Sequence, residues 1–422
     1  MAIVLRHRRT SVPSGGLSGG IQRIAMLAID ASPLALSGAD EDGGVNTYVR
    51  ELAHGFACHG VETDVFTRAT DPAQPPVMVL EPGVRVIHLR VGPRAPVPRA
   101  ELGPLLGKVV RAVVRAERHH GPYQVLNSHC WVSGWVGSQL RPRLKLPLVH
   151  HSHSLGLERN AVVTASEPAW HPDRVAREAQ IVAAADVLVA ACQNDRYLLV
   201  EWYGAASQKV RVVTTGVDHE RFRPGDQQLA RDRLSVTRAH LLAYVGRLHP
   251  IKGVDLAVQT MAELARGHPA LDVELLVVGG SSSAAEVAPL RALAAWEAVS
   301  DRVRFLPAQP HSALPTIYRA ADLVLMPSRT EPFALAAIEA QACGVPLVAA
   351  RVGGLPELIN EGITGVLVAD RDPRAYAMAI ATLLGNPARL MLMRQATAEH
   401  GRGFDWRTSA TKLLAACAEV VQ

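Results

Sequence analysis

The segment PSRTEPFALAAIEAQACGVPLVA, residues 327–349, carries two carboxylates whose spacing could support chemistry. Glu331 lies in a proline-containing loop, and Glu339 lies eight residues later, on the helix that the loop opens into. We expect Glu331 at the helix N-terminus and Glu339 about two turns inside. Free N–H groups and the macrodipole favour anions at a helix N-terminus. A carboxylate there would repel a phosphate unless it binds the hydroxyls of an attached sugar, so the pattern indicates a nucleotide-sugar site.

Two cations in a second segment suit the phosphates of such a ligand. In YVGRLHPIKGVDLAV, residues 244–258, Arg247 and Lys252 follow a predicted buried strand and precede a helix. Arginine offers a fork of donors and lysine a point charge, and both bind a diphosphate well. A solvated loop is the alternative for this segment alone. Its pairing with Glu331 and Glu339 in the same half of the chain favours the diphosphate.

Glycine pairs mark two further turns. Gly43 and Gly44 in EDGGVNTYVREL would let a phosphate approach backbone N–H groups at the start of a helix, with a plain loop and cap as the alternative. The segment is not a G-x-G-x-x-G and has no acidic residue placed for a ribose, which argues against a dinucleotide fingerprint. Gly353 and Gly354 predict either a turn beneath a ligand or an ordinary packing turn.

A histidine cluster follows another predicted strand. In LVHHSHSLGLERN, residues 148–160, the imidazoles belong to His150, His151 and His153, and Glu158 is the nearest carboxylate. A metal site is one interpretation. A cluster without a close carboxylate is more typical of structural or substrate-contacting histidines, so we expect no metal.

Length and composition place the chain among globular proteins of two domains. A chain of 422 residues is too long to fold around a single hydrophobic core of ordinary size. Its 48% hydrophobic and 20% charged residues are typical of α/β proteins. No apolar run approaches the ~20 residues that span a bilayer, so we expect no membrane insertion. The arginines near the N-terminus lack an apolar stretch behind them, so residues 1–20 read as a disordered tail or an overcalled start rather than a secretory signal.

The cysteine content and the net charge bear on the cellular compartment and on the binding partners of the protein. Five cysteines without a CxxC indicate reduced thiols and a cytoplasmic protein. The net charge of +5 raises the question of nucleic acid, but 44 basic residues face 39 acidic ones, and the arginines are dispersed. A basic cleft for a diphosphate explains this bias, and we expect no nucleic-acid partner.

Strand-like runs alternate with helix-like runs through both halves of the chain. The helix pattern is clear at 45–56, where apolar residues recur at helical spacing. Alternation of this kind predicts an α/β protein with two Rossmann-like, doubly wound parallel-sheet domains facing across a cleft. We place them at 21–216 and 217–400, with 401–422 as a helix crossing back to the first domain. The predicted strands are 24–29, 61–67, 84–89, 125–127, 146–150 and 187–191, then 210–213, 241–245, 273–278, 303–306, 322–326 and 346–349.

Together these motifs resemble the family-4 retaining glycosyltransferases of the GT-B fold. The similarity rests on the early glycine pair, GRLHPIKG, and EPFALAAIEAQACGVPLVAARVGGLPELI, and it spans residues 43–368. DGGVNTYVRELA, FTRAT, HCWVSGW and HSHSLGLERN resemble the enzymes of the mycothiol pathway that transfer N-acetylglucosamine from UDP to inositol 3-phosphate. Sucrose-phosphate synthases and aminoglycoside glycosyltransferases are related.

The resemblance implies a role for each donor-side residue. Arg247 and Lys252 would hold the diphosphate, Glu339 the ribose and Glu331 the sugar, with His153 near the transferred sugar. Backbone groups at Gly43, Gly44, Phe333, Ala334 and Leu335 would complete the donor site. Most members of the family have glycine where this chain has Ala334, so its methyl group would trim the sugar pocket.

The acceptor side departs from the inositol-phosphate pattern. The implied residues are Asn46, Arg99, Cys130, Ser154 and Arg174. Arg99 stands in place of lysine, Ser154 in place of threonine, and Cys130 in place of a tyrosine whose hydroxyl is lost. These changes favour an unphosphorylated aminocyclitol acceptor, 2-deoxystreptamine of aminoglycoside antibiotic biosynthesis. The alternatives are transfer to inositol 3-phosphate in mycothiol biosynthesis, a UDP-sugar 2-epimerase, and a non-catalytic nucleotide-sugar-binding protein.

The resemblance also implies a mechanism without a cofactor or metal. The leaving diphosphate would take the acceptor's proton on one face of the sugar. The catalytic residues would be Arg247, Lys252, His153 and Glu331, with charge stabilisation as the main contribution. The partners are then a UDP-sugar and a small cyclitol. The sequence leaves the donor sugar, glucose or N-acetylglucosamine, and the oligomeric state open, with a homodimer as one alternative.

Overall fold

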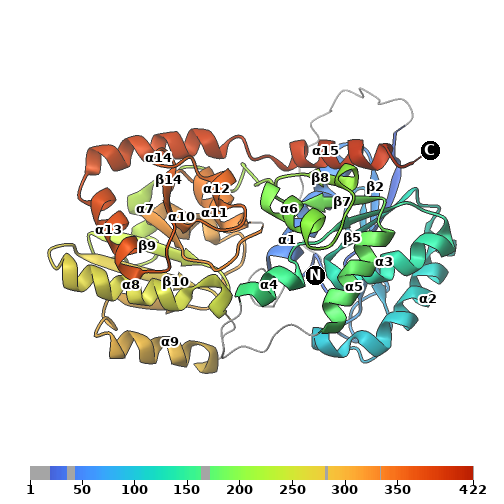
Figure 1. Ribbon diagram of the computed structural model, residues 1–422, viewed down its shortest axis with the longest axis horizontal. Coiled ribbons are helices and arrows are strands. Elements are labelled where there is room, and N and C mark those ends of the chain that lie inside the picture. Colours follow the sequence, from blue (N-terminus) through green and yellow to red (C-terminus); the bar gives the residue numbers. More distant parts are fainter. Residues whose placement is uncertain (1–19, 36–42, 163–171, 281–283, 333, 422) are drawn as a thin grey trace.

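The computed structural model describes residues 20–35, 43–162, 172–280, 284–332 and 334–421. The predicted tail, except residue 20, and the predicted donor contact Phe333 lie outside these ranges. The described chain forms two lobes, each built on one sheet (Figure 1). We call them the N-terminal lobe, with the eight-stranded sheet, and the C-terminal lobe, with the six-stranded sheet.

The described strands follow the predicted ones closely. In the first sheet the order is β3-β4-β2-β1-β5-β6-β7-β8, and in the second β11-β10-β9-β12-β13-β14. Their bounds are β1 (Arg23–Leu27), β2 (Glu62–Arg68), β3 (Val77–Glu81), β4 (Val84–Leu89), β5 (Val125–His129), β6 (Leu148–His151), β7 (Val187–Ala190), β8 (Val210–Val212), β9 (His240–Val245), β10 (Val273–Val278), β11 (Val303–Leu306), β12 (Leu323–Met326), β13 (Leu347–Ala350) and β14 (Gly365–Val368).

Helices connect most neighbouring strands, because parallel strands need a crossover. They are α1 (Gly43–Cys58), α2 (Gly103–His120), α3 (Cys130–Leu144), α4 (Gly156–Val162), α5 (Pro172–Ala184), α6 (Gln193–Glu201), α7 (Gln227–Arg233), α8 (Val254–Gly267), α9 (Ala284–Trp296), α10 (Leu314–Ala320), α11 (Leu335–Ala342), α12 (Leu355–Leu358), α13 (Pro373–Leu384), α14 (Pro387–Gly401) and α15 (Trp406–Ala418), with 3₁₀ turns η1 (Arg99–Glu101), η2 (Ser207–Lys209) and η3 (Pro250–Lys252).

The predicted fold class is confirmed, and the sheets add three details. All described pairings are parallel except that of β3 with β4. Strand β3 was not among the predicted strands, because its partly exposed residues do not form the pattern of a buried strand. The short strand β14 was not predicted either. The run at 210–213 forms β8, at the edge of the first sheet.

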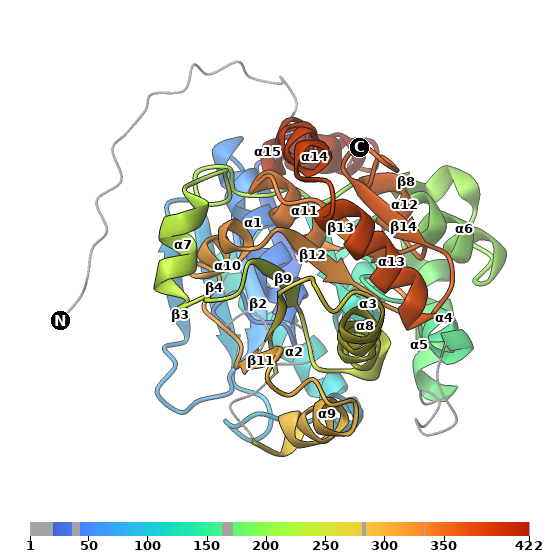
Figure 2. The same cartoon turned by 90° about the vertical axis from the view of Figure 1, so that its left-hand side faces the viewer.

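Each sheet is covered by helices on both faces, which explains why strands such as β10 are buried along their whole length. In the C-terminal lobe, α8 and α13 pack together on one face while α7 and α10 pack on the other (Figure 2). The N-terminal sheet has one core beneath α2 and α3 and another beneath α1 and α15. No helix in the described part of the chain has the length and apolar character to cross a membrane.

The last helix joins the two lobes. After α14, which packs on α11 of the C-terminal lobe, the chain continues into α15, which packs on α1 of the N-terminal lobe (Figure 1). Trp406, the first residue of α15, meets the Tyr48 ring edge-on at 5.1 Å. Because Tyr48 lies on α1, this contact holds α15 against α1, the helix that begins at the cleft.

Candidate active site

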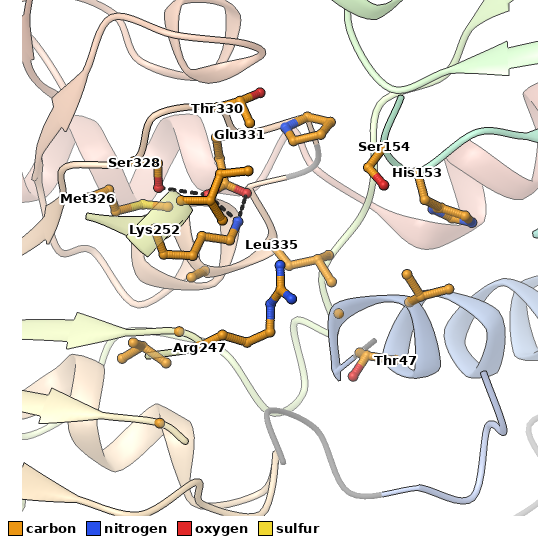
Figure 3. Close-up of a pocket in the computed structure, with 18 of the residues that line it drawn as sticks. Thr47, His153, Ser154, Arg247, Lys252, Met326, Ser328, Thr330, Glu331 and Leu335 are labelled. Atoms are coloured by element: carbon orange, nitrogen blue, oxygen red, sulfur yellow. Dashed lines mark hydrogen bonds and ion pairs between the residues drawn. The ribbon is translucent and has the colours of Figure 1, made fainter. Parts of the chain in front are cut away.

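A pocket between the lobes collects most of the predicted site residues. Its lining includes, from the N-terminal lobe, Gly44, Arg99, Cys130, His153 and Ser154, and from the C-terminal lobe, Arg247, Lys252, Glu331, Leu335 and Glu339. The described lining does not include Asn46, Arg174 or Ala334. Figure 3 shows residues of the two lobes facing one another across this pocket.

Lys252 and Glu331 form an ion pair at the centre of the C-terminal wall. The Lys252 ammonium donates to both carboxylate oxygens, at 2.7 Å to Oε1 and 2.6 Å to Oε2, and the Ser328 hydroxyl donates to Oε2 at 3.0 Å (Figure 3). Burial lowers the pKa of the Lys252 ammonium, and the Glu331 charge opposes that shift. Lys252, which was predicted to bind the phosphates, and Glu331, which was predicted to bind the sugar, therefore already contact each other. A bound ligand must contact these two groups while they also contact each other.

Local structure explains why these two residues meet. β9 and β12 are neighbours in the sheet, so the segments after their carboxyl ends lie side by side. Lys252 ends η3, and the next residue, Gly253, has φ 70°. A Cβ there would lie 2.0 Å from the carbonyl oxygen of Pro327, so only glycine allows this approach.

Glu339 is held by two donors on the same wall. Its Oε1 lies 2.6 Å from Nε2 of His311, and its Oε2 accepts from the Tyr318 hydroxyl at 2.8 Å. The Arg221 guanidinium lies 3.0 Å from Nδ1 of His311, so that nitrogen accepts and Nε2–H donates to Glu339. Burial, and then Glu339, raise the pKa of Tyr318, which keeps its hydroxyl a donor.

The start of helix α11 differs in two respects from what the sequence predicted. Helix α11 begins at Leu335, so Glu339 lies just over one turn inside the helix and not two. Ala334 caps the helix with φ 46°, a left-handed conformation, and it is 1% exposed within the core cluster behind the wall. Its methyl group therefore packs into the core and does not trim the pocket. Gly353 and Gly354 also pack beneath the loop, where Gly354 N–H donates to the Glu331 carbonyl at 2.9 Å.

The N-terminal wall contains two strained residues. Cys130, at the start of α3, has φ 64°, and His153, which follows β6, has φ 59°. Left-handed conformations are costly for residues other than glycine and persist where surrounding structure fixes them, commonly at functional sites. Gly43 is the first residue of α1, so Gly44 presents the N-terminus of that helix to the pocket.

Three buried imidazoles stack behind this wall. The rings of His129, His151 and His153 have interplanar angles of 25°, 26° and 17°. Nδ1 of His129 lies 2.8 Å from Nε2 of His153, and His151 contacts the Tyr48 hydroxyl at 3.2 Å and the Asn127 amide at 3.1 Å. Burial, with smaller effects of the neighbouring histidines, holds the pKa of each ring well below its usual range.

This geometry suits hydrogen-bonded neutral rings better than a metal centre. The ligand atoms lie within 4.8 Å of one another. However, imidazole lone pairs lie in the ring plane, so nearly parallel rings direct them poorly toward one ion. The stack instead fixes the orientation of His153, the member that reaches the pocket.

The predicted acceptor residues divide into a lining set and a supporting set. Arg99 lines the pocket and pairs with Asp30 at 2.6 Å. Arg174 lies behind it, pairs with Glu178 at 2.7 Å, and donates to the Ser154 carbonyl and hydroxyl at 2.9 and 3.1 Å. Asn46 is buried on α1. Arg174 therefore positions Ser154 from behind the described lining.

Several polar residues of the pocket were not predicted as site residues, among them Glu158, Arg159, Thr330 and His311. Glu158 and Arg159 lie on α4, inside the segment that carries the histidines, and Thr330 lies beside Glu331. Their positions next to recognised motifs were a usable signal. No local pattern marks His311. Burial, followed by the charges of Arg174, Arg247 and Arg99, lowers the pKa of Arg159 to about 9, which indicates a crowded cationic region suited to anions.

Family profiles match both halves of the chain. The profile described as Glycosyltransferase Family 4 matches residues 42–221, and that described as Glycosyl transferases group 1 matches residues 239–386. Two parallel-sheet domains with a pocket between them, together with these matches, define a glycosyltransferase of the GT-B type. The chain belongs to glycosyltransferase family 4.

Several curated relatives and solved structures are similar over nearly the whole chain. A D-inositol 3-phosphate glycosyltransferase of Acidothermus cellulolyticus is 42% identical over 97% of this chain and 92% of its own. A second from Catenulispora acidiphila is 42% identical over 93% and 94%. The structure of sucrose-phosphate synthase from Thermosynechococcus elongatus is 34% identical, with a TM-score of 0.85 over 93% of this chain and 97% of that one. WaaG, at 17% identity and a TM-score of 0.71, shares the fold.

Proposed function

We propose that this glycosyltransferase moves N-acetylglucosamine from UDP to D-inositol 3-phosphate with retention at the anomeric carbon. Relatives at 41–42% identity carry the name D-inositol 3-phosphate glycosyltransferase, and the comparisons favour this alternative over 2-deoxystreptamine. The proposal keeps the donor-side roles suggested by the sequence and revises the acceptor.

The observation that carries the proposal is the presence of cations on both walls of one pocket. Arg247 and Lys252 lie on the C-terminal wall, and Arg99 and Arg159 on the N-terminal wall. A UDP-sugar bound at the first pair leaves the second pair facing the acceptor. The guanidinium groups of Arg99 and Arg159 can donate to an acceptor phosphate in addition to their present contacts, whereas an aminocyclitol would add positive charge beside them. Arg159 was not among the residues from which an unphosphorylated acceptor was predicted.

The residues support transfer on one face of the sugar. Arg247, Lys252 and the N-terminus of α11 would stabilise the charge that develops on the leaving diphosphate. Glu331 would bind sugar hydroxyls and Glu339 the ribose. The diphosphate oxygen accepts the proton of the attacking hydroxyl, so this scheme needs no side-chain nucleophile and no metal.

A panel of acceptors tests the proposal. The protein is incubated with UDP-N-acetylglucosamine and, separately, D-inositol 3-phosphate, inositol and 2-deoxystreptamine, and UDP release and product mass are followed. Transfer to the phosphate ester at the highest kcat/KM is the expected result. Preference for 2-deoxystreptamine would restore the earlier interpretation, and release of an epimerised sugar without acceptor would indicate an epimerase.

Substitution of Arg159 tests the phosphate contact itself. Arg159→Gln should raise KM for D-inositol 3-phosphate about 10- to 100-fold, the range for losing one hydrogen bond to a charged group, with the donor KM little changed. Arg177→Gln is a matched control, because Arg177 lies over the Trp135 ring away from the described pocket lining. Equal KM values for wild type and Arg159→Gln would contradict the assignment.

A further inference from the structure

A hydrogen bond joins the two lobes inside the pocket. The Thr330 hydroxyl of the C-terminal lobe donates to Oε1 of Glu158 on α4 of the N-terminal lobe at 2.5 Å. Glu158 is 8% and Thr330 6% exposed. Both line the pocket, although they lie 172 residues apart in the chain. The proposed binding of the donor and the acceptor does not depend on this contact.

The contact bears on the loop that carries Glu331. Thr330 directly precedes Glu331, whose side chain pairs with Lys252. Contacts within the C-terminal lobe hold this loop on both sides of Thr330: Arg329 N–H donates to the Ile251 carbonyl at 2.8 Å, and Gly354 N–H donates to the Glu331 carbonyl at 2.9 Å. Glu158 therefore adds a constraint that depends on the position of the other lobe.

The surroundings of Glu158 favour a specific role over simple packing. Burial raises the pKa of this carboxyl, whereas the Thr330 hydroxyl and the charges of Arg159 and Lys252 oppose the shift, and Glu331 adds to it. A buried carboxylate is costly unless its partners are well placed. The hydrogen bond from Thr330 is supplied by the other lobe, so the separation of the lobes affects how well the Glu158 carboxylate is satisfied.

We propose that Glu158 is a positioning residue that ties the Glu331 loop to the N-terminal lobe, so that the Lys252–Glu331 pair reaches its reactive position only when the lobes are closed. This proposal rests on the proposed transferase function. Small misplacements of reacting groups cost about 100-fold in rate. Closure also excludes water, which otherwise competes with the acceptor for the donor sugar.

Two single substitutions and their combination test the coupling. Glu158→Ala and Thr330→Val should each lower kcat for transfer about 10- to 100-fold while changing the donor KM about threefold or less. The double variant should lose no more than either single one, because both remove the same contact. Thr330→Ser restores the hydroxyl and should recover most of the rate.

A second contact between the lobes provides the control. Gln193 N–H donates to Oε1 of Glu357 at 2.7 Å, in an exposed position outside the described lining. Glu357→Gln should leave kcat within about twofold of wild type, since an amide oxygen still accepts and exposed contacts contribute little. Circular dichroism and thermal unfolding of each variant show that it is folded.

Hydrolysis of the UDP-sugar in the absence of acceptor provides a readout independent of the acceptor's identity. Glu158→Ala and Thr330→Val should raise the ratio of hydrolysis to transfer, because an open cleft admits water. Where transfer is absent, both substitutions should lower the hydrolysis rate, and not additively, because the displaced pair assists departure of the diphosphate with either nucleophile. Fully additive losses in kcat, a change confined to the acceptor KM, or an unaltered hydrolysis ratio would overturn the coupling. Failure of wild type to use D-inositol 3-phosphate overturns the proposed acceptor alone, because the hydrolysis comparison stands without it.

Discussion

Replacing Lys252 by methionine distinguishes the contribution of the Lys252–Glu331 ion pair to folding stability from its contribution to the catalytic rate. Methionine has similar length and no charge, so Lys252→Met removes the ammonium and largely keeps the packing. The Glu331 carboxylate then remains in the wall with Ser328 as its other side-chain donor. The variant should therefore lose both folding stability and catalytic rate.

The stability loss follows from the burial of the pair. Breaking a fully buried ion pair costs about 3–5 kcal/mol, and an exposed pair contributes about 0–1 kcal/mol. The Glu331 side chain is 7% exposed and the Lys252 side chain 21%, so this pair falls between those limits, at about 2–3 kcal/mol. Adding Glu331→Gln removes the unpaired charge and should recover most of that loss.

The rate loss should not be recovered in the same way. Removing one charge partner of a transition state costs at least about 100-fold in kcat. If Lys252 stabilises the leaving diphosphate, the double variant Lys252→Met/Glu331→Gln is stable but much less active than Glu331→Gln alone. A purely structural lysine would instead leave the double variant about as active as Glu331→Gln alone.

Urea unfolding and initial rates of UDP release measure the two effects on the same samples. Arg351→Met is the matched control, because Arg351 pairs with Glu361 at 2.7 Å in the same lobe with both side chains about half exposed. It should change stability by about 0.5 kcal/mol or less and leave the rate unaltered. Turnover of Lys252→Met within about fivefold of wild type would refute the role of Lys252.

Three further predictions concern the ribose site, the buried histidines and the thiols. Glu339→Gln should raise the donor KM about 10- to 100-fold with a smaller effect on kcat, and an unchanged KM in steady-state kinetics would exclude a ribose contact. Burial lowers the pKa of His150 from 6.5 to about 3, so the unfolded chain binds the proton better below pH 6.5, and folding should weaken by about 2 kcal/mol between pH 7 and pH 5. Urea midpoints should therefore depend less on pH in His150→Gln, and equal slopes would contradict the assignment. Cys58 is exposed and the other four cysteines are buried, so Ellman's reagent should modify one thiol rapidly in the folded protein and five after unfolding, and more than one fast thiol would contradict the described packing.

The meeting of Arg247, Lys252 and Glu331 on one wall of the pocket was predictable from the sequence, because these residues follow the rules of parallel sheets. Arg247 and Lys252 come after one strand and Glu331 after another, and neighbouring strands present such segments at the same edge. The position of Glu339 within α11 was misjudged, because the helix begins only after the left-handed Ala334. Helix boundaries are set by such local backbone geometry, which composition does not reveal.

The rest of the site depends on contacts between distant segments. His311 reaches Glu339 from a loop before α10, and Glu158 reaches Thr330 from the other lobe. Such pairs obey no periodicity, so no local pattern predicts them. Arg159 was visible beside the histidine motif, but its role as a pocket cation depends on how α4 faces the cleft. The prediction of an unphosphorylated acceptor therefore did not include Arg159.

The most direct test of the account is the structure of the product made from UDP-N-acetylglucosamine and D-inositol 3-phosphate. The purified wild-type protein is incubated with both substrates, and the product is examined by mass spectrometry and proton NMR of the anomeric signal. We expect a single phosphorylated N-acetylglucosaminyl inositol with the α configuration of the donor. A β-linked product, or UDP release without any glycosylated inositol phosphate, would contradict this expectation.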